Sequence, residues 1–315
     1  MSSAGRRTSL LEAFMAAAHA RGGRVLAADA DPLAPSLYLA DAAIRLPPIA
    51  SEDYEEALFA TVEREGVGLL IPTIDTELGP LASWRERFLL LGCQPAISEP
   101  ELIRVTADKV EAARAFAEAG VKVVPTWELD QLSEVALPEQ LVVKPRAGSA
   151  SQNVRLVGRE EVWQAVKSVP SAIVQPQVAA PEVTIDALLS FSGQPLHYVP
   201  RKRLRTLAGE SIQGVTIADP ELEAWIIEVL DLIGQWGGRG PLTLQAFLTE
   251  GPSLSEVNAR FGGGFPLALA AGGSYPEWLV AMAAGEVIEP RLGQYRKGLY
   301  MSRTHRELFF EVPRW

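Results

Sequence analysis

One change in the pattern of apolar segments limits the possible folds of this 315-residue chain more than any other feature. Residues 1–98 alternate short continuous apolar runs with helical patterns, which is typical of a parallel sheet covered by helices on both faces. Residues 182–258 carry successive apolar runs with one helical pattern inserted, which predicts antiparallel strands. The sequence therefore predicts an α/β protein with a parallel N-terminal lobe, a boundary near residue 98, and α+β lobes after it.

Periodicity places the individual elements of the N-terminal lobe. The pattern predicts helices at 8–21, 52–65 and 76–87, and strands at 24–28, 68–72 and 88–92. A strand normally precedes the first helix of such a lobe, but the seven residues before it contain no apolar run. The first strand is missing from the pattern, and whether the native chain begins earlier stays open.

The remaining elements follow from the same patterns. Residues 99–125 read as a helical connector, with Ser98 as its cap and Glu101 as the capping-box partner. The next part of the chain predicts strands at 141–145, 153–157 and 172–176 and a helix at 159–168. Beyond it we expect strands at 183–191, 195–200, 242–248 and 254–259 and a helix at 221–236.

Composition excludes several classes of protein. A net charge of −10 argues against broad nucleic-acid or anionic-membrane binding, since both need a basic surface. Glu12 interrupts the apolar stretch that would otherwise resemble a signal peptide. The apolar stretch 265–285 contains Pro266 and Pro276, which argue against a membrane span. Cys93 is the single cysteine and reads as a buried structural thiol, so we expect a reducing, cytoplasmic environment.

The segment LVVKPRAGSASQNVRLV, residues 141–157, carries the first chemical signal. Lys144 ends a buried strand, and the loop 147–151 contains only small residues. Small side chains let backbone N–H groups approach phosphate oxygens, and the lysine ammonium supplies a countercharge. The lysine precedes the loop, unlike in the Walker pattern. The alternative interpretation is an ordinary hairpin with a strand-edge lysine.

A second signal lies in LTLQAFLTEGPSLSEVNARFGGGFP, residues 242–266, where two strands meet at a Gly-Pro turn. Alternate residues of a strand share a face, so Glu256, Asn258 and Arg260 point the same way, and Gln245 lies on the partner strand. Carboxylate and amide oxygens suit Mg²⁺. A surface cross-strand pattern is the alternative, but the glycines that follow favour a close approach of backbone.

Four basic residues stand close together after the strand PLHYVP, namely Arg201, Lys202, Arg203 and Arg205. In an acidic chain this concentration indicates an anion site, with solvated surface charges as the alternative. We take Lys202 and Arg205 as candidates to bind a substrate carboxylate or the transferring phosphoryl group.

Lys144 with its small-residue loop, IVQPQVAAPEVTID, and Gln245 with EVNAR and a glycine run together resemble the ATP-grasp superfamily. The likeness extends to SAGRR, DADPLAP, IPTID and PRKR, and it is strongest to single-copy proteins related to the large subunit of carbamoyl-phosphate synthase. The resemblance implies four segments: a Rossmann-like pre-ATP-grasp domain (1–98), a small lobe with its connector (99–178), a large lobe with the metal site (179–295) and a C-terminal tail (296–315).

The resemblance also implies roles for individual residues. Arg260 would steady an acyl phosphate, together with the basic candidates Lys202 and Arg205. Metal ligands would be Gln245, Glu256 and Asn258, holding Mg²⁺, with Mn²⁺ as the alternative ion. ATP would be bound by Lys109, Lys144, Gly148, Ser149, Ala150, Ser151, Gln175, Pro176, Gln177, Val178 and Glu182.

Two positions depart from the pattern of the superfamily. Pro176 stands where relatives commonly have glutamate, so it keeps the carbonyl that reads adenine but has no N–H to donate. Gln245 is a neutral amide where many relatives have a carboxylate, which implies weaker metal binding or one dominant ion.

The activity that the resemblance implies is an ATP-dependent carboxylate–amine (or ammonia) ligase that works through an acyl phosphate and releases ADP and phosphate. The alternative is a non-catalytic ATP-binding or regulatory subunit of a carbamoyl-phosphate-synthase-like assembly. A nicotinamide-dependent dehydrogenase is disfavoured, because no G-x-G-x-x-G follows a strand in the N-terminal lobe. We expect small-molecule carboxylate and amine substrates and neither nucleic acid nor membrane as partner, and a homodimer stays open.

Overall fold

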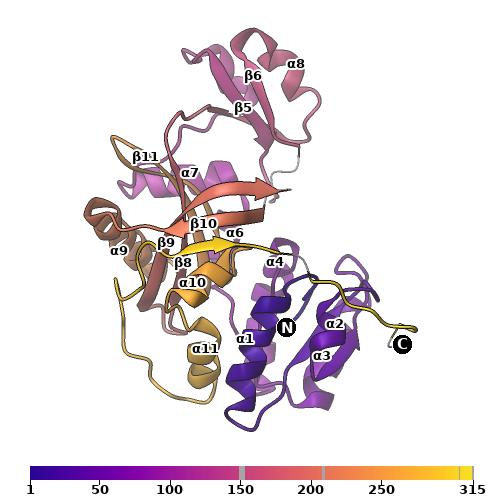
Figure 1. Cartoon of the computed structure of the whole chain (residues 1–315). Helices are drawn as coiled ribbons and strands as arrows, with labels where there is room; N and C mark the ends of the chain where they lie inside the picture. The colour runs from indigo at the N-terminus through magenta and orange to yellow at the C-terminus, as the bar shows by residue number, and fades with distance from the viewer. Residues whose placement is uncertain (149–152, 208–209, 305, 314–315) are drawn as a thin grey trace.

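The computed structural model describes the whole chain except residues 149–152, 208–209, 305 and 314–315. Three lobes are visible in Figure 1: an N-terminal lobe, a small lobe around β5 and β6, and a large lobe between them. The predicted fold class is confirmed, since a parallel N-terminal sheet is followed by two antiparallel sheets. No helix in the described part of the chain combines the length and the apolar character that crossing a bilayer requires.

The N-terminal lobe has two pairs of parallel strands covered by helices. Strand β1 pairs with β2, and β3 pairs with β4. The strands are β1 (Leu26–Asp29), β2 (Ala42–Arg45), β3 (Leu69–Leu70) and β4 (Gln94–Pro95). The helices are α1 (Thr8–His19), α2 (Ser36–Leu39), α3 (Tyr54–Glu65), α4 (Asp75–Ser83) and α5 (Arg85–Leu90). Strand β2 and helix α2 had no signal in the apolar pattern.

The first residues of the chain occupy the place of the strand that the sequence pattern lacks. Ala28 N donates to Met1 O over 2.8 Å, and Ser2 N donates to Ile71 O over 3.0 Å. Ser2 also forms a parallel bridge with Pro72. Backbone hydrogen bonds on both sides therefore join the two strand pairs into one layer, although this segment carries no apolar run.

The strand predicted at 88–92 is wrong, because these residues belong to the end of α5 and the turn after it. Phe88 is fully buried, but Leu90 is 87% exposed, so only one face of the apolar run packs. A short apolar run does not distinguish a strand from a buried helix end. Cys93 follows as a buried free thiol, and burial raises its pKa to about 12.

Two helices, α6 (Pro100–Ala107) and α7 (Lys109–Glu118), form the connector. The predicted capping box at Ser98 is wrong, since Glu99 is the N-cap residue and no side chain caps α6. Ser98 Oγ instead donates to the carbonyl of Arg239 over 3.2 Å and accepts from its N–H over 3.0 Å. The cap that does form is Asp108, which accepts from two N–H groups of α7.

The small lobe is a three-stranded antiparallel sheet in the order β6-β5-β7 with its own hydrophobic core. Its strands are β5 (Gln140–Pro145), β6 (Arg155–Gly158) and β7 (Ala172–Pro176). One side is covered by η1 (Leu129–Ser133), η2 (Arg159–Glu161) and α8 (Val162–Val166). The last two elements together form the helix predicted at 159–168.

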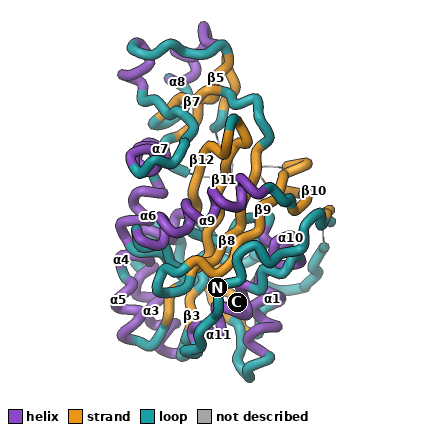
Figure 2. Tube along the Cα trace, turned by 90° about the vertical axis from the view of Figure 1, so that its left-hand side faces the viewer, coloured by secondary structure: helices purple, strands orange, loops and turns teal. Residues whose placement is uncertain are grey.

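The large lobe is a six-stranded sheet in the order β12-β11-β8-β9-β10-β13. Its strands are β8 (Glu182–Leu189), β9 (Pro195–Leu207), β10 (Glu210–Thr216), β11 (Gly240–Thr249), β12 (Gly251–Asn258) and β13 (Tyr300–Ser302). Helix α9 (Pro220–Gln235) lies across it, as Figure 2 shows, and buries its apolar face there. Strands β10 and β13 were not predicted, so part of the expected tail 296–315 is an edge strand.

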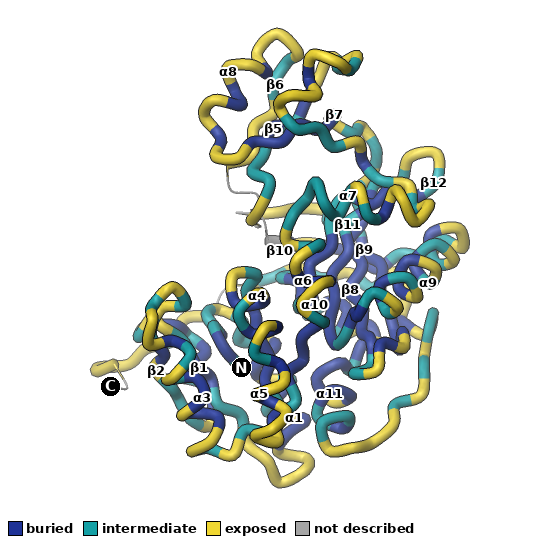
Figure 3. Tube along the Cα trace, turned by 180° about the vertical axis from the view of Figure 1, so that it is seen from behind, coloured by how far each residue is buried: buried dark blue, intermediate teal, exposed yellow. Residues whose placement is uncertain are grey.

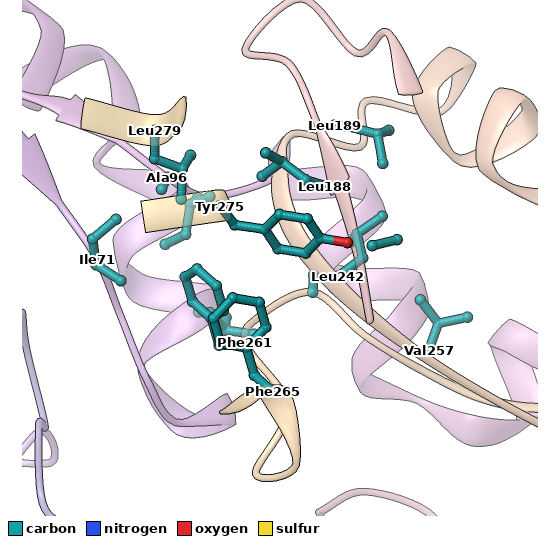
Figure 4. Close-up of a cluster of buried hydrophobic side chains, with 14 of the residues drawn as sticks. Ile71, Ala96, Leu188, Leu189, Leu242, Val257, Phe261, Phe265, Tyr275 and Leu279 are labelled. Carbon is teal, nitrogen blue, oxygen red and sulfur yellow. The ribbon is translucent and has the colours of Figure 1, made fainter. Parts of the chain in front are cut away.

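One continuous core joins the N-terminal and large lobes. Helices α10 (Phe265–Ala270) and α11 (Tyr275–Ala283) lie at this junction. Figure 4 shows Tyr275 with Phe261 and Phe265 between Ile71 of the N-terminal lobe and Leu242 of the large sheet. Buried residues fill this junction and the large sheet, while the outer surface of the small lobe is mostly exposed (Figure 3). The two lobes therefore form one base, to which the small lobe is attached.

Candidate active site

A cavity of about 800 Å³ opens where the three lobes meet. The small lobe supplies one wall through β5, β6 and β7, and the large lobe supplies another through β8, β9, β11 and β12. The inner end is closed by Arg7, by the loop 73–76 of the N-terminal lobe and by the glycines 262–264. Every lobe therefore contributes residues to one open cavity.

Two lysines face the cavity from the small lobe and the connector. Burial lowers the pKa of Lys144, the neighbouring charge of Lys109 lowers it further, and the carboxylate of Glu256 opposes this. Lys109 Nζ donates to the carbonyl oxygen of Gly148 over 2.6 Å. Two ammonium groups on this wall would attract the phosphates of a nucleotide, and a phosphate would raise the pKa of Lys144 again.

Gly148 itself lines the cavity with a φ of +100°, a conformation that favours glycine. The other predicted loop residues, Ser149, Ala150 and Ser151, lie outside the described residues. The loop prediction therefore stays a prediction beyond Gly148.

The segment that leaves the small lobe lines the same cavity from Gln175 to Val178. Gln175 is buried, and its Nε2 donates to Thr126 Oγ1 over 2.8 Å, while Gln177 N donates to Gln140 O over 3.0 Å. This end of the cavity also has an apolar lining, formed by Val124, Val142, Leu156 and Phe247. Apolar walls beside a backbone edge suit a flat, partly polar ring such as a purine.

One face of the large sheet borders the cavity. Strands β9, β8, β11 and β12 are paired in register, so their side chains on this face form rows across the sheet. The middle row consists of Arg201, Thr184, Gln245 and Glu256, each paired with the next across β9, β8, β11 and β12. All four line the cavity. One row of the sheet therefore leads from a carboxylate through an amide and a hydroxyl to a guanidinium.

Two further rows flank the middle row. The outer row contains Glu182 and Phe247, and the Arg203 guanidinium donates to both oxygens of Glu182. Glu182, one of the predicted ATP ligands, is therefore held in an ion pair in this structure. The inner row contains Asp186, Thr243 and Asn258 and is partly covered by the glycines 262–264.

The candidate metal ligands Gln245, Glu256 and Asn258 lie together on this face. A β-bulge at Ser255 follows from the register, which pairs Gln245 with Glu256 and Ala246 with Leu254. Within the described part of the chain, no group of three or more His, Cys, Asp or Glu side chains is placed to hold a metal. The donor set of one carboxylate and two amides fits Mg²⁺ only when phosphate oxygens complete its shell.

The candidate metal ligands Gln245, Glu256 and Asn258 are called the metal edge below. Arg260 connects this metal edge to the N-terminal lobe. Its Nη2 donates to Asp75 Oδ2 over 2.6 Å and to Asn258 Oδ1 over 3.3 Å. Arg7 makes a second bridge, donating to the carbonyls of Thr73 and Phe261 over 3.2 Å each. The sequence predicted Arg260 but assigned no role to Asp75 or Arg7, whose motifs IPTID and SAGRR were the available signal.

The basic candidates Lys202 and Arg205 do not line the cavity, whereas Arg201 and Arg203 do. The prediction ended the strand at residue 200, but β9 continues to Leu207. Side chains alternate along a strand, so Lys202 faces away from Arg201 and Arg203. Arg205 shares their parity, but it is exposed beside an irregular part of the β9–β10 register.

Comparison with protein families gives two matches. Residues 1–96 match the PylC-like N-terminal domain, and residues 168–306 match the family described as ATP-grasp in the biosynthetic pathway with Ter operon. No curated protein sequence matches the chain.

Solved structures share the fold over nearly the whole chain. Biotin carboxylase from Campylobacter jejuni, in a β,γ-ATP complex, has a TM-score of 0.74 at 16% identity, covering 95% of this chain and 73% of its own. The biotin carboxylase domain of Hydrogenobacter thermophilus 2-oxoglutarate carboxylase, with MgADP, ADP and bicarbonate, has a TM-score of 0.75 at 16% identity, covering 95% and 72%.

A third structure is N5-carboxyaminoimidazole synthetase from Staphylococcus aureus complexed with ADP, with a TM-score of 0.72 at 16% identity, covering 92% of this chain and 77% of its own. These matches and the family models confirm the predicted ATP-grasp fold. The finer likeness to carbamoyl-phosphate synthase stays a prediction.

Proposed function

We propose that this protein, whose chain carries an ATP-grasp domain behind a PylC-like N-terminal domain, is an ATP-dependent ligase that joins a carboxylate to an amine or ammonia. The observation that carries the proposal is the meeting of opposite walls in one cavity. Lys109 and Lys144 face the cavity from one side, and Gln245, Glu256 and Asn258 face it from the other. Three solved structures that share the fold contain ATP analogues or ADP.

In the first step a carboxylate oxygen of the substrate attacks the γ-phosphorus of ATP, and the bond from that phosphorus to the β-phosphate oxygen breaks. ADP leaves and an acyl phosphate remains. Lys109 and Lys144 would neutralise the phosphate oxygens of the nucleotide, and Arg260 would stabilise the charge that moves onto the acyl phosphate. Little covalent chemistry is required of the protein, which positions the reactants and stabilises charge.

In the second step the amine nitrogen attacks the acyl carbon, the bond from that carbon to the phosphate oxygen breaks, and the amine loses a proton. Inorganic phosphate is the second product. A bound Mg²⁺ would polarise the phosphate oxygens, and Glu256, Gln245 and Asn258 are the residues that would hold it. The meeting of three lobes around the cavity suits this chemistry, since an acyl phosphate must be kept from water.

ADP formation tests the proposal. Purified protein is incubated with ATP, Mg²⁺ and a panel of carboxylates and amines, and hydroxylamine is added to trap an acyl phosphate as a hydroxamate. We expect ADP and hydroxamate with at least one carboxylate, and a loss of two orders of magnitude or more, about 3 kcal/mol, in Lys144→Ala. The exposed Lys167→Ala, which removes a lysine from the same lobe, should match the wild type.

A second function is favoured by the metal edge, which has one carboxylate and two neutral amides. A non-catalytic ATP-binding or regulatory subunit would bind nucleotide with these residues and show no turnover. Calorimetry measures nucleotide binding, and the assay above measures ADP formation. Nucleotide binding without ADP formation from any carboxylate supports the regulatory subunit. Equal ADP formation by Lys144→Ala and wild type contradicts the ligase.

A further inference from the structure

The middle row of the large sheet contains two residues, Thr184 and Arg201, that have no proposed role in binding the nucleotide or the metal. Gln245 and Glu256 are metal candidates, whereas Thr184 and Arg201 continue the row away from the metal edge. Neighbouring strands lie about 4.8 Å apart, so Thr184 is next to Gln245, and Arg201 is roughly 10 Å from it. This distance places the pair beside the position of a phosphoryl group that the metal edge would hold.

Thr184 and Arg201 are each only 2% exposed, yet both belong to the cavity wall. Thr184 Oγ1 and Arg201 Nη1 are buried and have no hydrogen-bond partner among the residues that the structure describes. Leaving a buried donor without a hydrogen-bond partner is unfavourable. Two such groups on adjacent strands, in register with each other, therefore form a polar site without a protein ligand.

Arg201 is held rigidly in this place. Its Nε donates to Asp186 Oδ2 over 2.7 Å, in an ion pair that is almost fully buried. A Cβ atom on Gly264 would lie 2.4 Å from Arg201 Cζ, and one on Gly262 would lie 2.8 Å from Asp186 Oδ1. Only glycine backbone fits against the pair, so the glycine segment covers one side of the guanidinium and fixes its position at the cavity wall.

The charge balance of the site selects its ligand. Asp186 already offsets the charge of Arg201, so the ligand is bound mainly by hydrogen bonds: it accepts from Arg201 Nη1 and pairs with the hydroxyl of Thr184, which can donate or accept. A carboxylate accepts from both groups at once, whereas a primary amide has one acceptor oxygen for Arg201 and leaves its N–H₂ to Thr184 Oγ1. Together with the position beside the metal edge, this favours an acceptor carboxylate over a neutral group.

We infer that Thr184 and Arg201 bind the carboxylate of the substrate that receives the phosphoryl group. This inference rests on the proposed ligase function and adds its acceptor site. One carboxylate oxygen accepts from Arg201 Nη1 and the other from Thr184 Oγ1. Arg260, which is paired with Asp75 at the inner end, remains the group for the acyl phosphate.

The test uses acetate labelled with ¹³C at its carboxyl carbon, titrated into protein saturated with MgADP and observed by NMR. We expect acetate to bind the wild type and acetamide not to bind. Thr184→Val, which replaces the hydroxyl by a methyl group of the same shape, should weaken acetate binding about tenfold. Thr249→Val makes the same replacement at an exposed position of β11 outside the cavity wall and should bind acetate like the wild type.

Arg201→Lys is the second variant, since it keeps a cation beside Asp186 while it removes the planar donor group. Circular dichroism and MgADP affinity report whether each variant is folded. Equal acetate binding by Thr184→Val and wild type, or equal binding of acetamide and acetate, overturns the inference. Binding of inorganic phosphate that depends on Thr184, without acetate binding, also overturns it, because the site would then hold the phosphoryl group.

The nucleotide measurement keeps the two proposals apart. If MgADP does not bind the wild type, the proposed ligase function fails, and the acetate titration is repeated on nucleotide-free protein. If MgADP binds and acetate binding does not depend on Thr184, only the acceptor site fails.

Discussion

Glu77 is a buried carboxyl group that organises the turn at the inner end of the cavity. Ser2 Oγ, Ser3 Oγ and Tyr54 OH donate to it over 2.9, 2.7 and 2.6 Å. Burial raises its pKa above the usual value, although the three hydrogen bonds act in the opposite direction. Asp75, which pairs with Arg260, stands two residues before Glu77 in the first turn of α4, so the protonation state of Glu77 matters for the geometry of the site.

The pKa of Glu77 is higher in the folded state than in the unfolded state, so above the unfolded-state pKa the folded state binds more protons. The stability that Glu77 contributes therefore falls as the pH rises from the unfolded-state pKa through the folded-state pKa. We predict that Glu77→Gln removes this dependence, so the variant gains stability relative to the wild type as the pH rises above the usual pKa of a glutamate, about 4.3. Urea unfolding at several pH values measures the difference. Parallel pH profiles for the two proteins would contradict the prediction.

Lys144 gives a second prediction for a single side chain. Because burial lowers its pKa and phosphates raise it, nucleotide binding should be accompanied by proton uptake at alkaline pH, below the ordinary pKa of a lysine. Calorimetry in buffers of different ionisation enthalpy measures the uptake. We expect Lys144→Met to lose it and Lys167→Met to retain it, and uptake that is unchanged in Lys144→Met would assign the proton to another group.

The residues of the site differ in how far their sequence context allowed them to be predicted. Lys144, Glu256 and Asn258 stand in strands whose apolar pattern gives their direction, and all three line the cavity. Arg201 could be distinguished from Lys202 only with the length of β9, which the polar outer half of the strand does not reveal. Which basic residues face the cavity thus depends on pairing with β10, the next strand along the chain, which the apolar pattern did not predict.

At the scale of single elements, the best-defined local signal is the cap of α7. Asp108 accepts from Val110 N over 2.9 Å and from Glu111 N over 3.2 Å, and its other oxygen pairs with Arg146 over 2.6 Å. The helix begins with Lys109, so the cap also positions a lysine of the site.

We predict that Asp108→Ala costs about 1 kcal/mol of stability and weakens nucleotide binding, because the first turn of α7 frays. Asp108→Asn keeps the cap, loses the ion pair with Arg146 and should cost less than Asp108→Ala, since partly exposed ion pairs contribute little. Urea unfolding and MgADP titration of both variants measure the two effects. If Asp108→Asn and Asp108→Ala lose the same free energy of unfolding, the ion pair with Arg146 stabilises the start of α7 and the cap does not.

Elements were predicted well where their apolar period was long and poorly where it was short. Helices α1, α3 and α9 have several turns with one buried face, and their predicted positions agree with the structure within a few residues. The run at 88–92 offered a single turn, and β13 has three residues without a buried one. Such short elements are stabilised by the strand or core surface that they pack against, and their own sequence does not indicate which segment that is.

For the whole molecule, the distribution of hydrophobic cores separates one base from one attached lobe. The core of the small lobe, which includes Val143 and Val174, has no member in the core that joins the other two lobes. The sequence predicted a boundary near residue 98, but it did not indicate that the lobes on either side share one core. That shared core depends on contacts between side chains that are far apart in the sequence. The ring centroids of Phe14 and Phe261, for example, lie 5.8 Å apart.

Separate cores predict separate openings, because local unfolding follows contiguous packed units. We expect the amides of β5 and β7 to exchange with solvent through an opening of lower free energy than those of β8 and β11. Val143→Ala, at a fully buried position of the small lobe, should speed exchange in β5 and β7 and leave β8 and β11 unchanged. Ile185→Val, buried in the base, is the matched variant and should speed exchange across the large and N-terminal lobes together. Faster exchange in β11 of Val143→Ala would mean that the small lobe unfolds only together with the base, which would contradict the prediction that the two cores open separately.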